Sequence, residues 1–302
     1  MFRHIILPLD GSALAESVLP AAVYLTRVFD AKITLVHIVE KGSSATVHGE
    51  RHLTRPEEAK QYLLEVRQKA FPPEAAVLIH VHESVVEDVA RSIVDHEDEL
   101  TPDLIVMCSH GRGGLRDLLF GSIAQQVISS GRVPVLLVRP EGTTCKHGFD
   151  CRTLLAPTDG RADHEIGLVA AADLARATGA RLQLIAVAPT VGTLAGRDAA
   201  AGRYMPGTTH AMLDIQEDEL RTYLGKMLRR FESQGIGVSA IVSRGDPAGV
   251  IAENADAADI DLIIFATHGK AGTKAFWSHS VGARVLAQTS RPILLVPVSA
   301  AL

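Results

Sequence analysis

Apolar runs of four to seven residues alternate along the chain with longer segments whose apolar residues recur every three or four positions. Such runs are typical of strands buried on both faces of a parallel sheet, and such segments are typical of helices that cover it. The first half therefore predicts a doubly wound α/β domain with right-handed crossovers. Its predicted strands are residues 5–9, 33–39, 77–81, 104–107 and 133–138, and its predicted helices are 12–29, 57–71, 84–94 and 122–130.

The whole pattern occurs twice. Residues 103–111 return 158 positions later as 261–269, and residues 5–11 return at a spacing of 149 as 154–160. The larger offset means about nine added residues in the second half, which we assign to the Gly/Ala/Pro-rich segment 190–209 and expect to form a loop. A chain of 302 residues is long enough for two domains, which we place at 1–141 and 152–302 with a linker at 142–151.

Composition and charge exclude several classes of partner. The chain is 47% apolar, so each half can bury a core. The net charge of -5 arises in the first 150 residues, where 20 acidic residues stand against 15 basic ones. This balance argues against binding to nucleic acid or to an acidic membrane surface. The chain has no run of about 18 apolar residues and no signal-like N-terminus, so we expect a cytoplasmic protein.

The cysteines and histidines predict no metal site. Three cysteines are too few for a disulfide framework. Cys145, His147 and Cys151 gather in the linker without a fourth ligand that the sequence identifies, and a metal role for them is left open. His80 and His82 share one face of a predicted strand, where solvated side chains are the favoured interpretation.

Two segments have the character of a ligand site. In a doubly wound sheet the ligand crevice lies at the carboxyl ends of the strands, where the strand order reverses. Asp10 follows the first strand, and a glycine-rich segment follows the fourth and leads into Gly121 and Ser122 at the start of a helix. Glycines let backbone amides approach an anion, and a helix N-terminus favours negative charge. One copy of this pattern is equally compatible with phosphate binding and with simple capping of the helix.

Known phosphate-binding loops do not match this segment, because the chain has no G-x-x-x-x-G-K-[ST] and lacks the third glycine of a G-x-G-x-x-G. The segment resembles that of the universal stress protein family, whose nucleotide-binding members carry a glycine, two residues, a glycine, nine residues and then Gly-Ser or Gly-Thr. Gly111, residues 112–120 and Gly121-Ser122 match this spacing, and Cys108 stands in place of the first glycine. The resemblance covers nearly all of both halves.

The resemblance implies two tandem doubly wound α/β domains, each a five-stranded parallel sheet of order 3-2-1-4-5 flanked by helices. It also implies ATP, with or without magnesium, at the switch between strands one and four. Asp10 and the backbone near Ile38 would hold ribose and adenine, and backbone amides of the glycine motif would hold the phosphates. The residues expected to bind nucleotide are Pro8, Leu9, Asp10, Ile38, Met107, Cys108, His110, Gly111, Arg112, Gly121, Ser122 and Ile123.

A second, weaker site is expected in the second half. His279 stands there in the position of Gly121, where it adds a side chain against the phosphates and disfavours a positive φ. Occlusion is the favoured interpretation, and an imidazole that donates to a phosphate is the alternative. The residues of this second site are Pro157, Thr158, Asp159, Val187, Ala266, His268, Gly269, His279 and Ser280.

The function expected from these features is that of an ATP-binding stress-response or regulatory protein with nucleotide mainly in the first domain. The alternative is an interaction module of the same fold that binds no nucleotide. No pair of general acid and base can be placed in the crevice, so we expect at most slow ATP hydrolysis. Pairing of strands 134–138 and 292–296 would reproduce the family dimer within one chain, and a homodimer of such chains is left open.

Overall fold

The computed structural model describes residues 1–41, 46–47, 50–51, 53–109, 121–140, 149–194, 196–267 and 280–298. These residues form two compact units. One contains Met1–Asp150 together with the last strand, β12 (Ile293–Pro297), and the other contains Cys151–Thr267 together with helix α11 (Val281–Gln288). Within the described ranges, no helix has both the length and the apolar content needed to cross a membrane.

The sheet of the first unit has the strand order β12-β7-β6-β1-β2-β5. Strands β7, β6, β1, β2 and β5 pair with one another in parallel, which confirms the predicted order 3-2-1-4-5. The last strand, β12, pairs antiparallel with β7, so the expected pairing of the two fifth strands is present. The parallel strands are β1 (His4–Pro8), β2 (Lys32–Glu40), β5 (Val77–Val86), β6 (Leu104–Cys108) and β7 (Val135–Val138).

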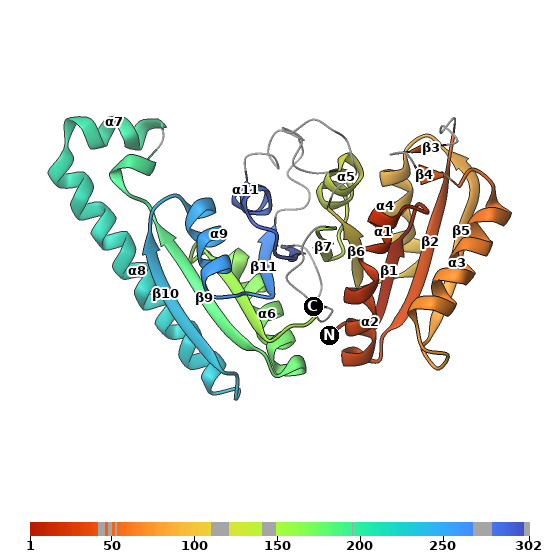
Figure 1. Ribbon diagram of the computed structural model, residues 1–302. Helices are drawn as coiled ribbons and strands as arrows, with labels where there is room; N and C mark the ends of the chain where they lie inside the picture. The colour runs from red at the N-terminus through yellow and green to blue at the C-terminus, as the bar shows by residue number, and fades with distance from the viewer. Residues whose placement is uncertain are drawn as a thin grey trace. The chain divides into compact units, whose positions relative to one another are not determined.

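Helices cover both faces of this sheet (Figure 1). Two adjacent residues of β2 point to opposite faces. His37 hydrogen-bonds to the Leu53 carbonyl, just before α3, and so marks the face that α3 covers. Ile38 is the register partner of His82, whose ring contacts His96 of α4, and so marks the face that α4 covers. The central strands are fully buried and form the core. The helices are α1 (Ala13–Glu16), α2 (Leu19–Phe29), α3 (Pro56–Ala70), α4 (Val89–Leu100) and α5 (Ser122–Ser130), and β3 (Thr46–Val47) pairs with β4 (Glu50–Arg51).

The second unit repeats this plan with the parallel strand order β10-β9-β8-β11. Its long helix α8 packs along β9 and β10, and α6 packs on β8 and β11 (Figure 1). The strands are β8 (Thr153–Thr158), β9 (Arg181–Ala188), β10 (Val238–Arg244) and β11 (Leu262–Thr267). The helices are α6 (Glu165–Thr178), α7 (Gly196–Tyr204), α8 (Pro206–Glu232) and α9 (Pro247–Ala257), with short 3-10 turns η1 (Ala162–His164) and η2 (Val191–Thr193).

Two helices of the first unit differ from the sequence prediction. The predicted helix 12–29 is divided into α1 and α2, and Pro20, which has no N–H to donate, lies in the first turn of α2. The predicted helix 84–94 is wrong at both ends. Residues 84–86 continue β5, and α4 begins after Asp88, whose side chain accepts a hydrogen bond from the Arg91 amide at 2.9 Å.

The predicted loop 190–209 is also wrong. This segment contains η2, all of α7 and the start of α8. Alanine has the highest helix propensity, and Ala199 and Ala200 lie in α7. Pro206 occupies the first turn of α8, where a proline is well tolerated. The residues added in the second half therefore lengthen its helical layer.

Candidate functional site

The strand order of the first unit reverses between β1 and β6. β1 pairs with β2 on one side and with β6 on the other, with Ile5 opposite Leu104 and Ile6 opposite Ile105. Because both pairings are parallel, the turn after β1 and the segment after β6 leave the sheet at the same edge. This edge is where doubly wound sheets bind ligands.

The turn after β1 is organised by the carboxylate of Asp10. Its Oδ1 accepts hydrogen bonds from the Ser12 amide at 2.9 Å and from the Ser12 hydroxyl at 2.7 Å. Ser12 Oγ in turn accepts from the Ala15 amide at 3.1 Å and caps α1. Gly11 between them has φ +92°, a conformation that favours glycine. Asp10 is exposed, and among the described residues no hydrogen bond is made to its Oδ2.

The start of α5 is tied to the end of β6. The Gly121 amide donates to the Ser109 carbonyl at 3.0 Å, and the Gln125 amide donates to the Gly121 carbonyl at 3.2 Å. Gly121 is the N-cap residue, and no side chain caps this helix in the described part of the chain. The amides of Ser122 and Ile123 lie in the first turn, where no carbonyl of the helix can accept from them. Both residues are exposed, so the N-terminus of α5 is open to an anion.

The other predicted residues of the first site line the same edge as buried or half-buried positions. Leu9 is buried, and its amide donates to the Val36 carbonyl at 2.8 Å. Ile38 and Met107 are buried, and Pro8 and Cys108 are half-buried. Cys108 does not have a positive φ, which explains why a side chain is tolerated where the family pattern has glycine. Predicted residues His110, Gly111 and Arg112 lie outside the described residues.

The corresponding carboxylate of the second unit has different partners. Asp159 Oδ1 accepts from the Arg161 amide at 3.1 Å and from His164 Nδ1 at 2.9 Å. The neighbouring Thr158 hydroxyl accepts from the Gly160 amide at 3.1 Å. Like Asp10, Asp159 is exposed and accepts both hydrogen bonds on one oxygen, but one of its donors is an imidazole rather than a hydroxyl.

The helix after β11 also differs from α5. Ser280 is the N-cap of α11, and its hydroxyl accepts from the Ala283 amide at 3.2 Å. The equivalent residue in the first unit, Ser122, is already inside its helix and makes no cap. One amide that α5 leaves open is therefore occupied in α11. Of the remaining second-site residues, Pro157, Val187 and Ala266 are half-buried, and His268, Gly269 and His279 lie outside the described residues.

Helix α8 crowds the turn after β8, a feature that the sequence reasoning missed. A Cβ atom placed on Gly160 would lie 3.3 Å from Leu220 Cδ2 and 3.9 Å from the Tyr223 ring. The Tyr223 hydroxyl is buried near Thr158 and Glu165 without a hydrogen bond of normal geometry among the described residues. Burial raises the pKa of Tyr223 to about 12, so the phenol is neutral. A repeated signal was available, because Tyr62-Leu63 and Tyr223-Leu224 stand at the same distance before the third strand of each half.

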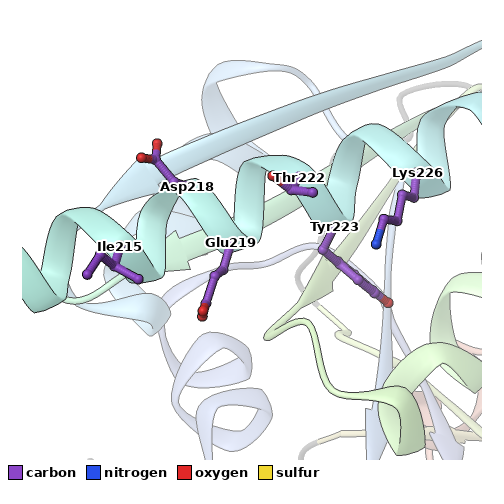
Figure 2. Close-up of a pocket in the computed structure, with 6 residues that line it drawn as sticks. All are labelled: Ile215, Asp218, Glu219, Thr222, Tyr223 and Lys226. Atoms are coloured by element: carbon purple, nitrogen blue, oxygen red, sulfur yellow. The ribbon is translucent and has the colours of Figure 1, made fainter.

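An open groove of about 470 Å³ runs along α8. Figure 2 shows Glu219, Tyr223 and Lys226 projecting from the same side of α8. No predicted site residue lines the groove. Its full set of lining residues is Ile215, Asp218, Glu219, Thr222, Tyr223 and Lys226.

The positive φ expected at the motif position of His279 is wrong for the equivalent residue, because Gly121 has φ -59° and ψ 134°, which any residue can adopt. Backbone conformation therefore does not require glycine at Gly121. The remaining difference between glycine and histidine at this position is the volume of the side chain.

Comparisons with known proteins agree with this fold. The universal stress protein family model matches residues 1–139 and 151–297. A universal stress protein of Methanocaldococcus jannaschii is 30% identical over 146 residues, which are 46% of this chain and 83% of that protein. A universal stress protein of Mycolicibacterium smegmatis is 25% identical over 303 residues, covering 97% of this chain and 96% of that protein.

A solved structure of a universal stress protein from Archaeoglobus fulgidus has a similar fold, with a TM-score of 0.67 and 19% sequence identity over 98% of both chains. The family match covers both halves of the chain, and the doubly wound strand order is the one that the family resemblance implied. The chain therefore belongs to the universal stress protein family and contains two of its domains in tandem.

Proposed function

We propose that the first unit binds ATP and that nucleotide occupancy gives the protein a regulatory role in a cytoplasmic stress response. The observation that carries this proposal is the meeting of an exposed carboxylate and an open helix N-terminus at one switch point. Asp10 follows β1, and the uncapped start of α5 follows β6. The ribose hydroxyl groups of a nucleotide can donate hydrogen bonds to the carboxylate, and its phosphates can accept them from the helix N-terminus.

The phosphates are assigned to the start of α5. Free amides and the helix dipole together favour an anion there. The amides of Ser122 and Ile123 point out of the first turn, and the bond from the Gly121 amide to Ser109 fixes their position. Gly111 and Arg112 are proposed to complete the phosphate site, as the family spacing implies. Mg²⁺ would accompany the nucleotide and offset the charge of its phosphates.

The ribose is assigned to Asp10. Two hydrogen bonds from Ser12 hold Oδ1, so Oδ2 is left to accept from a ribose hydroxyl without any rearrangement of the turn. A preorganised acceptor of this kind saves the entropy of ordering a side chain on binding. Adenine would then lie along the backbone near Ile38, with Met107 and Cys108 on its other side.

The second unit is proposed to bind nucleotide weakly. Its helix start is capped by Ser280 and α8 crowds the turn after β8, whereas the start of α5 in the first unit has no side-chain cap. Binding of about one ATP per chain follows.

The alternative is an interaction module that binds no nucleotide. Cys108 and Ala266 in place of the first motif glycine favour it, as does the crowded second unit. Neither interpretation calls for catalysis, and we propose at most slow ATP hydrolysis. The internal pairing of β7 with β12 supports a dimer-like unit within one chain.

Titration of the nucleotide-free, full-length protein with ATP tests the proposal. Replacing Asp10 by Ala removes a charge-assisted hydrogen bond worth about 1.5–3 kcal/mol, so affinity should fall roughly ten- to hundredfold. Asp10→Asn keeps an oxygen for the Ser12 amide and separates loss of charge from loss of the turn. Asp159→Ala is the matched control and should leave the affinity unchanged. Equal affinity in wild type and Asp10→Ala would contradict the proposed site, and no binding at all would favour the interaction module.

A further inference from the structure

Three histidines of the first unit meet at the edge of its sheet, away from the glycine motif. His80 and His82 lie two residues apart on β5, the last strand of the sheet, and His96 lies on α4. A nitrogen atom from each ring can be chosen so that all three lie within 4.8 Å of one another. His96 is 1% exposed, and the other two rings are half-buried.

The hydrogen bonds of His96 orient its ring as a ligand. Its Nδ1 lies 2.5 Å from the Ser92 carbonyl, which can only accept, so Nδ1 carries the hydrogen and Nε2 carries a lone pair. This is the arrangement by which a carbonyl commonly fixes the tautomer of a metal-bound histidine. His80 Nε2 lies 2.9 Å from His96 Nε2 and donates its hydrogen to this lone pair, and a bound cation would replace that hydrogen, with His80 then carrying its hydrogen on Nδ1. The ring centroids of His80 and His82 lie 4.7 Å and 5.1 Å from that of His96.

The spacing fits a small tetrahedral cation. Zinc binds imidazole nitrogen at about 2.0–2.1 Å, so two ligands at a tetrahedral angle stand about 3.3 Å apart. The two Nε2 atoms need to separate by only about 0.4 Å to reach this distance. Glu99 Oε2 lies 3.9 Å from His96 Nε2 but is not one of the ligand atoms that lie within 4.8 Å of one another, so the fourth position is left to solvent.

The second unit shows that the fold does not need these histidines. The sheet register aligns His80 with Ile241 and His82 with Ser243, and the repeat aligns His96 with Asn254. Asn254 instead accepts a hydrogen bond from Gln183 at 3.1 Å. A polar cluster that one copy has and the other replaces by ordinary packing points to a ligand in the first copy.

We propose that His80, His82 and His96 form a binding site for a divalent transition-metal ion of the zinc class, with solvent in the fourth position. Three imidazoles suit zinc better than the oxygen-seeking cations magnesium and calcium. The ion would join the edge strand β5 to α4. It would therefore stabilise the outer part of the first unit independently of any nucleotide.

The test uses the full-length protein freed of metal by a chelator and titrated with Zn²⁺ against a chromophoric competitor. Wild type should bind one tight equivalent, and His82→Gln, which alters a half-buried ring, should weaken that binding at least about 100-fold. His96→Asn, which installs the residue of the second unit, should do the same. His210→Gln changes an exposed histidine on α8 and should leave the affinity unchanged. Far-ultraviolet circular dichroism of each metal-free variant checks its fold.

Substitution with Co²⁺ identifies the ligands. The expected result is a visible spectrum of tetrahedral cobalt without a thiolate charge-transfer band, and its loss in His82→Gln. Equal zinc affinity in wild type and His82→Gln would overturn the proposal. So would a thiolate band, which would assign the ion to cysteines, or the absence of any binding tighter than that of the His82→Gln protein.

Discussion

Asp10 and Asp159 show how one residue type acquires two different environments in the two repeats. The hydrogen bonds to Asp10 come from its own turn and use one oxygen, whereas Asp159 also faces His164. The difference arises from the residues that follow, because Ser12 in the first turn is replaced by Arg161 in the second. Identity of the motif aspartate therefore does not establish equal binding.

His4 illustrates a second effect at the scale of one residue. It is 8% exposed in β1, and its Nε2 lies 2.8 Å from the Thr34 hydroxyl. Burial, followed by the positive charge of Lys32, lowers its pKa below the usual 6.5, and nearby Asp103 only partly opposes this. The folded state therefore binds the proton less readily than the unfolded state.

We predict that His4→Gln flattens the pH dependence of stability. Since the folded-state pKa is lowered, the unfolded state takes up more protons as the pH falls below about 6.5, and wild type loses stability there. Glutamine keeps a polar partner for Thr34 and does not titrate. Urea unfolding between pH 7.5 and pH 5 should show a smaller loss in His4→Gln than in wild type, while the exposed control His210→Gln should follow wild type. Parallel losses in all three proteins would contradict the burial argument.

Helices α5 and α11 show the same divergence at the scale of an element. Both follow the fourth strand of their repeat, and both carry the repeated serine, but α5 begins at Ser122 and α11 begins one residue after Ser280. The shift of one residue turns Ser280 into a cap and leaves the first amides of α5 open. A local change in helix start thus distinguishes a helix N-terminus without a side-chain cap from a capped one.

We predict that replacing the two serines by alanine changes the unfolding free energy by different amounts. Ser280→Ala removes a side-chain cap and should cost about 1 kcal/mol of unfolding free energy. Ser122→Ala removes no cap and should change stability by less than about 0.5 kcal/mol. Urea unfolding of both variants measures the difference. A larger loss in Ser122→Ala than in Ser280→Ala would show that the helix starts are not as described.

The elements that the sequence could predict are those with strong local patterns. The five strands of the first half follow from apolar runs, their order was implied by the family resemblance, and both are confirmed. The break at Pro20 and the cap at Asp88 also had local signals that the periodicity argument passed over. By contrast, the meeting of His96 with His80 and of Tyr223 with Gly160 depends on tertiary packing between distant segments. No local pattern specifies such contacts.

At the scale of the whole molecule, the repeat supplies both a second domain and a partner strand. The last strand of the second repeat belongs to the first compact unit and lies antiparallel to β7, with Leu294 opposite Leu136. This pairing uses the backbone N–H and C=O groups at the edge of β7, which would otherwise be open to pairing with another chain. The first compact unit thus includes residues near the end of the chain.

The central claim is that one chain holds about one ATP, in the first unit. Calorimetric titration of the nucleotide-free, full-length protein with ATP and Mg²⁺ measures the number of sites directly, together with Gly121→His, which places the residue of the second repeat in the first site. We predict about one equivalent with micromolar affinity, roughly -8 kcal/mol, and loss of most of this binding in Gly121→His. Two equivalents of equal affinity, or unchanged binding in Gly121→His, would contradict the account.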